Sequence, residues 1–159
     1  MSDSIVILPA RKYDESSILD VMRPWNMHHV PSPEMEELDL SRFFVALSDG
    51  KVIGAAGYKI LTPTTGKTTL LGVLPGYGKQ GVGKRLHHAR CQAMYKLGIR
   101  KVTTNSDLPS TIRWYQQHFG YKTVGTLKKV SSFGSPDIDH WTTMEMDLEA
   151  YRNVATEKF

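Results

Sequence analysis

Apolar positions along the chain recur with two periods, which predict its helices and strands. Spacings of three and four residues are typical of an amphipathic helix, whereas short apolar or alternating runs are typical of strands. The helical spacing is clearest in one run that is closed by Gly98 and contains Val82, Leu86, Ala89, Ala93 and Leu97. Helices are expected at residues 14–24, 34–39, 82–97 and 110–119, and strands at 4–8, 43–47, 52–61, 68–74, 101–105, 121–130 and 141–148.

The connections between these elements are short, which favours antiparallel neighbours. Residues 48–51 read Ser-Asp-Gly-Lys between two strand-like runs, a hairpin signal. Asp14 is expected to cap the first helix and Pro24 to end it, and a further turn is expected at residues 64–67. Because no linker or repeat interrupts the sequence, we expect one domain over residues 1–159.

Composition places the chain among ordinary globular proteins. Hydrophobic residues make up 40% and charged residues 23% of 159 residues. The single cysteine, Cys91, excludes an internal disulfide and is expected to pack within its helix. No apolar run reaches the roughly 18 residues of a membrane span, and the first residues lack the basic start of a signal peptide. These features predict a cytoplasmic protein that has no contact with a membrane.

Charge is distributed unevenly along the chain. No Asp or Glu lies between Asp49 and Asp107, whereas ten Lys and Arg lie there, so this interval carries +10 and the remainder −6 of the net +4. A basic interval favours an anionic partner, and the alternatives are a solvated surface or a nucleic-acid-binding module. Nucleic acid is disfavoured, because Tyr95 is the only aromatic residue between Lys79 and Lys101.

A glycine-rich turn lies at the centre of the basic interval, between a predicted strand and a predicted helix. Four glycines occur within residues 76–83, and the amides at a helix start suit phosphate. A P-loop would need a hydroxyl where Arg85 stands, and a dinucleotide fold would need an acid near Lys101. Both of those matches are therefore interpreted as accidental.

Two motifs extend the pattern over nearly the whole chain. The first is Val73-x-Pro75-x-Tyr77 followed by Gly81-Val82-Gly83, and the second is Trp114-Tyr115-x-x-x-Phe119-Gly120-Tyr121. Their sequence and spacing resemble the GCN5-related N-acetyltransferase (GNAT) family. The resemblance implies an α/β (α+β) domain with a mixed, mostly antiparallel sheet of about six to seven strands, flanked by helices and splayed in the middle for acyl-CoA.

The resemblance also implies acetyl-CoA as cosubstrate and names its contacts. The pyrophosphate is expected on the turn formed by Gly78, Lys79, Gln80, Gly81, Val82, Gly83 and Lys84. The pantetheine arm is expected beside Leu71 and Val73. Two family positions differ here: Gly78 replaces an Arg or Gln, and Leu108 replaces an Asn, for which Asn105 or Ser110 would substitute.

Acyl transfer needs a neutral amine, an oxyanion donor and an acid for the departing thiolate. By resemblance Tyr115 is the general acid, because a phenol with a pKa of about 10 stays protonated at neutral pH; its alternative role is packing. A backbone N–H near Val73 is the expected oxyanion donor. Glu34 and His29, with His28, are the candidate base or substrate contacts, and Asp107 and His140 are weaker candidates.

The function that these features predict is direct transfer of an acetyl group to the primary amine of a small molecule. A protein lysine or N-terminus is the alternative acceptor, and a non-catalytic acyl-CoA sensor is a further alternative. No metal is expected, because the adjacent pairs His28-His29 and His87-His88 lack the spacing of a helical zinc site. The last strands are expected to be exposed, which permits a homodimer.

Overall fold

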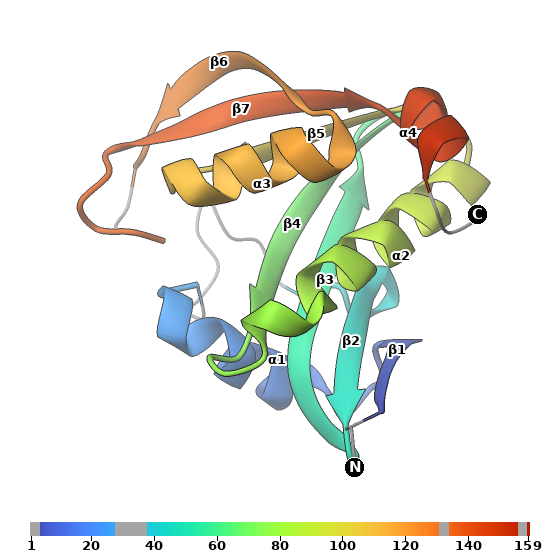
Figure 1. Cartoon of the computed structure of the whole chain (residues 1–159), viewed down its shortest axis with the longest axis vertical. Helices are drawn as coiled ribbons and strands as arrows, with labels where there is room; N and C mark the ends of the chain where they lie inside the picture. The colour runs from blue at the N-terminus through green and yellow to red at the C-terminus, as the bar shows by residue number, and fades with distance from the viewer. Residues whose placement is uncertain (1–3, 28–37, 131–133, 156–158) are drawn as a thin grey trace. The chain divides into compact units, whose positions relative to one another are not determined.

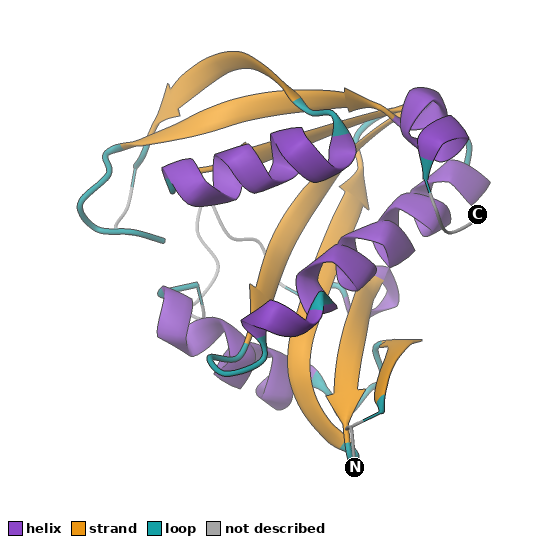
Figure 2. Cartoon of the chain, in the orientation of Figure 1, coloured by secondary structure: helices purple, strands orange, loops and turns teal. Residues whose placement is uncertain are grey.

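The computed structural model describes residues 4–27, 38–130, 134–155 and 159 (Figure 1). The described elements occur in the order β1 Ile5–Pro9, α1 Glu15–Met22, β2 Phe43–Ser48, β3 Lys51–Ile60, β4 Thr65–Val73, α2 Val82–Lys96, β5 Lys101–Ser106, α3 Pro109–Phe119, β6 Lys122–Lys128, β7 His140–Asp147 and α4 Leu148–Val154. Short 3-10 turns lie at Arg23–Trp25, Leu40–Arg42 and Gly78–Gln80. Figure 2 shows the strands and helices by colour.

The strands form a mixed sheet in the order β1-β2-β3-β4-β5-β7-β6. Pairing is antiparallel between β1 and β2, β2 and β3, β5 and β7, and β6 and β7. Strands β4 and β5 are parallel, and their register pairs Thr65, Gly66 and Lys67 with Lys101, Val102 and Thr103. This architecture confirms the fold class and the strand number that the resemblance implied.

The chain divides into two compact units. The first comprises Met1–Tyr58 and Thr69–Arg90, and the second comprises Lys59–Thr68 and Cys91–Phe159. Strands β3 and β4 and helix α2 each contribute residues to both units. The single domain over residues 1–159 stays a prediction.

The core of the first unit explains why α2 carries its apolar residues at helical spacing. Val82 and Leu86 are fully buried against Ala46, Ile53 and Ala56 of β2 and β3. The helix lies close to the sheet at Gly54, where an added Cβ would meet the Leu86 side chain at 3.0 Å. Packing of the apolar stripe thus fixes the start of α2, which the glycine-rich turn precedes.

The core of the second unit is largely aromatic. Tyr115 and Phe119 of α3 are buried, and their rings contact Tyr121 and Tyr151 at centroid distances of 5.1 and 5.2 Å. The Tyr115–Tyr121 pair is edge-to-face, a geometry that adds to the gain from burial. Strand β6, at the end of the sheet, has every residue exposed, whereas β7 lies between β5 and β6 and buries Met144 and Met146, so the expected exposure holds for β6 and not for β7.

Three expectations for local structure were wrong. Helix α4 begins where the last strand was predicted to end: the Asp147 side chain accepts a hydrogen bond from Ala150 N, so an N-cap starts a helix there. Strand β4 begins at Thr65, because the turn closes through Thr62, whose hydroxyl accepts from the Thr65 amide. Asp14 bonds Arg11 and gives α1 no side-chain cap. Most of the predicted helix at 34–39 lies outside the described residues.

Candidate active site

The glycine-rich turn contains two glycines in the left-handed backbone conformation and leads directly into helix α2. Gly76 and Gly81 have φ values of +95° and +71°, which favour glycine, and α2 begins directly after Gly81. Hydrogen bonds from Tyr77 N to Leu74 O and from Gln80 N to Tyr77 O shape the turn. The first amides of α2 have no acceptor within the helix and lie at the positive end of its dipole, which suits an anion.

Gly78 differs from the two left-handed glycines. Its φ lies outside the left-handed range, and an added Cβ would meet nothing within 4 Å. Neither backbone conformation nor space therefore requires glycine at this position. Because Gly78 stands where the family has an Arg or Gln, the space beside the turn is open.

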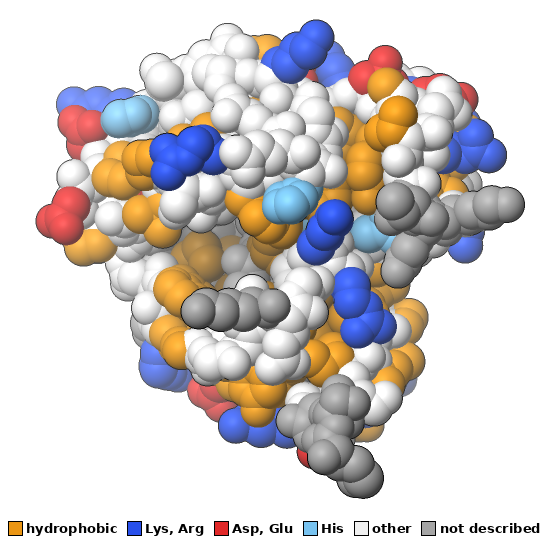
Figure 3. Space-filling model, viewed as in Figure 1, with side chains coloured by type: hydrophobic (Ala, Val, Ile, Leu, Met, Phe, Trp, Pro, Cys, Tyr) orange, Lys and Arg blue, Asp and Glu red, His pale blue; other side chains and the backbone are white. Residues whose placement is uncertain are grey.

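The basic side chains near the turn differ in their surroundings. Lys84 is exposed on the first turn of α2, whereas Arg85 Nη1 donates to Ile5 O of β1 at 2.9 Å. The side chain of Lys79 lies outside the described residues. On the face drawn in Figure 3, Lys and Arg stand as separate groups among apolar and neutral surface.

The end of β4 is packed against the segment after α1. Trp25 Nε1 donates to Val73 O at 3.1 Å, and Trp25 is 42% exposed. Gly72 leaves room for this packing, because an added Cβ would come within 2.7 Å of Met22 Sδ and 3.4 Å of the indole. Sequence reasoning missed the contact of Trp25 with β4, because no local signal links residues 48 positions apart.

The Trp25 contact limits how a ligand can pair with β4. One lone pair of the Val73 carbonyl is already used, so backbone pairing there has to rely on the remaining lone pair or on neighbouring groups. Leu71 and Val73 are half-buried and pack against the α2 core of the first unit. Their expected pantetheine contacts stay a prediction.

In the second unit, Tyr115 occupies an aromatic cluster. Its side chain is 4% exposed, and the Trp114 ring contacts it edge-on at 4.9 Å. The packing role considered for Tyr115 is therefore present in the structure. Its role as a general acid stays a prediction.

The other candidate residues in this unit differ in their surroundings. Asn105 Oδ1 accepts from Thr143 Oγ1 at 2.7 Å, and Ser110 is exposed in the first turn of α3. His140 is exposed, and its Nδ1 lies 3.1 Å from Asp139 Oδ1. The hydrogen bond from His140 lowers the pKa of the Asp139 carboxyl. His28, His29 and Glu34 lie outside the described residues.

Asp107 has a structural role that its sequence position did not reveal. Its carboxylate accepts from Lys129 Nζ at 3.0 Å, from Ser135 N at 2.7 Å and from Leu108 N at 2.9 Å. The Lys129 side chain is 6% exposed, and its ammonium lies 4.4 Å from the centre of the Trp141 ring. Asp107 thus links Lys129 to Ser135, and three donors already occupy its oxygens, which leaves it poorly suited to act as a base.

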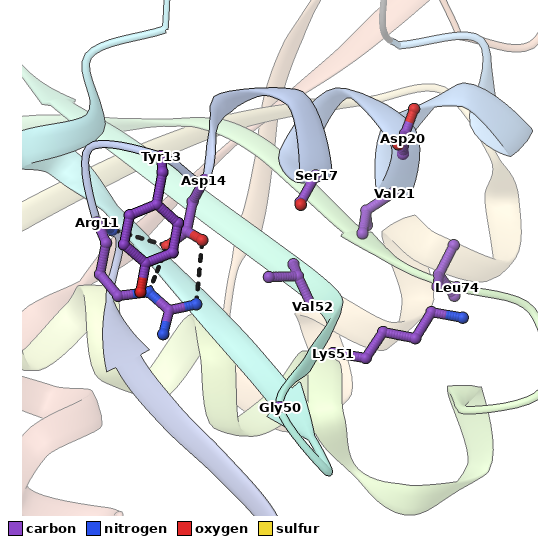
Figure 4. Close-up of a pocket in the computed structure, with 10 residues that line it drawn as sticks. All are labelled: Arg11, Tyr13, Asp14, Ser17, Asp20, Val21, Gly50, Lys51, Val52 and Leu74. Atoms are coloured by element: carbon purple, nitrogen blue, oxygen red, sulfur yellow. Dashed lines mark hydrogen bonds and ion pairs between the residues drawn. The ribbon is translucent and has the colours of Figure 1, made fainter.

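A cavity of about 280 Å³ lies in the first unit (Figure 4). Val21, Val52 and Leu74 contribute apolar surface to it, and the Arg11–Asp14 pair stands at one end. The Arg11 hydrogen bonds lower the pKa of Asp14, and burial opposes them. The cavity was not expected from the sequence, because its lining comes from separate elements.

Comparison with a family model decides the classification. The model of the acetyltransferase (GNAT) family matches residues 12–121. The chain belongs to this family. The match covers both predicted motifs, and the family is one of acyltransferases.

Solved structures share this fold at low sequence identity. The chain superposes on N-acetylglutamate synthase from Neisseria gonorrhoeae, complexed with coenzyme A and N-acetyl-glutamate, with a TM-score of 0.72 and 20% identity over 93% of this chain and 36% of that one. This GNAT chain therefore spans about a third of that protein. The ribosomal-protein-S18-alanine N-acetyltransferase from Escherichia coli gives 0.70 and 15% over 91% and 94%.

A third solved structure carries the acetylated cofactor. The putative acetyltransferase yncA from Salmonella typhimurium, with its cofactor acetyl-CoA, gives a TM-score of 0.70 and 17% identity over 91% and 94% of the two chains. No curated protein sequence matches this chain significantly. Because the identity to each of the three structures is 20% or lower, the likeness to them shows a shared fold.

Neither a cluster of metal ligands nor a membrane-spanning helix occurs among the described residues. Among residues 4–27, 38–130, 134–155 and 159, no three His, Cys, Asp or Glu side chains gather as metal ligands. In the same part of the chain, no helix has the length and apolarity to cross a bilayer.

Proposed function

We propose that this GNAT chain is an acetyl-CoA-dependent N-acetyltransferase that transfers the acetyl group to a primary amine of a small molecule. The observation that carries the proposal is the glycine-rich turn, with left-handed Gly76 and Gly81, opening directly into α2 within a chain of the acetyltransferase family. A helix start with exposed backbone amides suits a pyrophosphate.

Family membership and the low-identity neighbours support acetyl-CoA as the cosubstrate. Two of the three compared structures hold coenzyme A or acetyl-CoA. In the proposal, amides of residues 78–84 bind the pyrophosphate, and backbone groups of Leu71 and Val73 hold the pantetheine arm. Asn105 and Ser110 are further candidate contacts, and no metal takes part.

The chemistry that we propose is direct attack of the neutral amine on the thioester carbonyl. The nitrogen forms a bond to the acyl carbon, the C–S bond breaks, and the thiolate of CoA takes a proton. Tyr115 is the proposed donor of that proton, because it occupies the tyrosine position of the second family motif. Glu34 and His29 are the proposed base or substrate contacts.

A protein amine is the second candidate acceptor. One compared structure is named as acting on an alanine of a ribosomal protein, whereas another is complexed with N-acetyl-glutamate, so both acceptor classes occur among proteins of this fold. We also propose one domain, a cytoplasmic location based on the single cysteine, and a homodimer through the exposed strand β6.

Calorimetry with acetyl-CoA, followed by thiol release with a panel of amines and peptides, tests the proposal. We expect stoichiometric binding of acetyl-CoA and release of thiol with at least one free amine. Faster release with peptides than with free amines would assign the protein acceptor. Binding without release over both panels would favour the sensor, and failure to bind acetyl-CoA would refute the proposed function.

A further inference from the structure

Arg90 is a charged residue inside the apolar contact between α2 and the sheet. Its side chain is fully buried. Burial of a charge is costly unless hydrogen bonds replace its hydration. A fully buried Arg in an apolar stripe therefore needs specific partners, and the positions of those partners indicate what it does.

The guanidinium of Arg90 joins two neighbouring strands. Its Nη1 donates to Gly57 O of β3 at 2.9 Å and to Leu70 O of β4 at 3.0 Å. Its Nε donates to His87 Nδ1 at 2.7 Å, one turn earlier on α2. Burial lowers the pKa of His87 well below its usual value, so the imidazole is neutral and can accept.

Gly57 lies at a position of β3 where neighbouring side chains leave no room for a Cβ. An added Cβ at Gly57 would meet Thr69 Oγ1 in β4 and come within 2.6 Å of the Phe43 ring. Side chains of β2 and β4 therefore fill the space that a side chain at position 57 would need, beside the point where Arg90 bonds both carbonyls. Leu70 is buried at the same place, which restricts its backbone further.

The Leu70 carbonyl and the Leu71 amide belong to one peptide group. In a trans peptide these two groups point in opposite directions, and the bond between them is rigid. Because Arg90 holds Leu70 O on the side of β3, the N–H of Leu71 is directed to the opposite edge of β4. Leu71 begins the Leu-Gly-Val segment that the proposed function assigns to the acyl-CoA arm.

We propose that Arg90 is a positioning residue that orients the Leu71 N–H toward the thioester carbonyl of the acyl donor. This inference rests on the proposed function, which places the acyl donor beside Leu71 and Val73, and it goes beyond that function in choosing the Leu71 N–H as the oxyanion donor. A donor held in place before the reaction stabilises the developing charge without reorganisation. Arg90 acts through the peptide group and does not touch the substrate.

Substitution of Arg90 separates this role from simple stability. Arg90→Met keeps much of the side-chain volume but removes every donor, and Arg90→Lys keeps the charge but cannot bond three acceptors with a planar fork. Arg100→Met is the control, because Arg100 also donates to backbone carbonyls, at Ile99 and Tyr95, but neither carbonyl belongs to β4.

Steady-state thiol release and CoA calorimetry give the decisive comparison. Loss of one oxyanion donor costs about 100-fold to 1,000-fold in kcat, so misorientation by Arg90→Met should cost about 10-fold to 100-fold. We expect a smaller loss in Arg90→Lys and none in Arg100→Met. Affinity for CoA should change less than threefold, because CoA has no acyl carbonyl. Unchanged kcat in folded Arg90→Met, or an equal loss in CoA affinity, would overturn the inference.

Two further measurements distinguish a failure of this inference from a failure of the proposed function. If Arg90→Met does not fold, Arg90→Lys decides, and wild-type kcat in that variant overturns the inference. If the wild type releases no thiol, the proposed function fails, and the apo protein is compared by amide NMR. A shifted Leu71 resonance in Arg90→Lys, absent in Arg100→Met, supports orientation by Arg90, whereas an unchanged Leu71 resonance overturns it.

Discussion

The hydroxyl groups of Thr68 in β4 and Thr104 in β5 are hydrogen-bonded at 2.5 Å, and both side chains are buried. They follow directly after Lys67 and Thr103, the last residues paired in the parallel register. The bond therefore extends the pairing of the two strands by one position through side chains. In the proposed function, β4 serves the acyl donor beyond this point, so the hydroxyl pair anchors the strand from which that segment starts.

A double-mutant cycle on Thr68 and Thr104 measures the coupling free energy between the two hydroxyl groups. Thr68→Val or Thr104→Val alone leaves one buried hydroxyl without its partner, which costs about 1–3 kcal/mol of the free energy of unfolding. The double variant should cost less than the sum of the singles, with a coupling of about 1 kcal/mol. Urea unfolding of the four proteins tests this, and additive costs would show that the hydroxyls are independent.

Gly78→Arg should strengthen binding of acetyl-CoA. The position has an ordinary φ and open space, and an added guanidinium would stand beside the proposed pyrophosphate site. We expect a Kd lowered by about threefold to tenfold, an effect that weakens as salt rises. Gly78→Ala is the uncharged control and should bind as the wild type does. Gly81→Ala should weaken binding, because its φ of +71° strains any side chain.

Stability should fall as pH drops below the ordinary histidine range. Burial, Arg90 and His88 lower the pKa of His87 well below 6.5, so the unfolded chain binds a proton that the folded chain refuses. The free energy of unfolding then decreases with falling pH from about 6.5, by up to about 1.4 kcal/mol per pH unit for one group. The depressed pKa of Asp14 adds a separate loss only below about its unfolded value of 3.8.

Thermal melts at a series of pH values test this dependence. His87→Gln offers a neutral side-chain oxygen to Arg90, so its melting temperature should vary less between pH 7 and pH 5 than that of the wild type. An identical pH profile in the two proteins would remove His87 as the source of the effect.

Tyr115→Phe should lower kcat with little change in affinity for CoA. Loss of a general acid costs about 100-fold or more, whereas the ring continues to pack against Trp114 and Tyr121. Tyr121→Phe removes a neighbouring hydroxyl from the same cluster and should keep its kcat within a few-fold. If Tyr115→Phe turns over like the wild type, Tyr115 belongs to the core alone.

Much of the fold was predictable, because its signals lie in contiguous residues. Periodic apolar positions predicted α2 and α3, and Asp49-Gly50 predicted the hairpin between β2 and β3. Helix α4 was missed although Asp147 is a recognisable N-cap, because the strand pattern before it was extended too far. The beginning of β4 was missed because a threonine hydroxyl, rather than glycine, organises the preceding turn.

The sequence alone determined the glycine-rich turn, the family motifs and the basic interval, since each is a local run of residues whose spacing carries the meaning. Tertiary structure alone decided which polar groups meet. Trp25 bonds Val73, Lys129 bonds Asp107, and Arg90 bonds carbonyls of two strands. Such buried donors and acceptors find partners far along the chain, because folding removes them from water and leaves an unmet hydrogen bond costly.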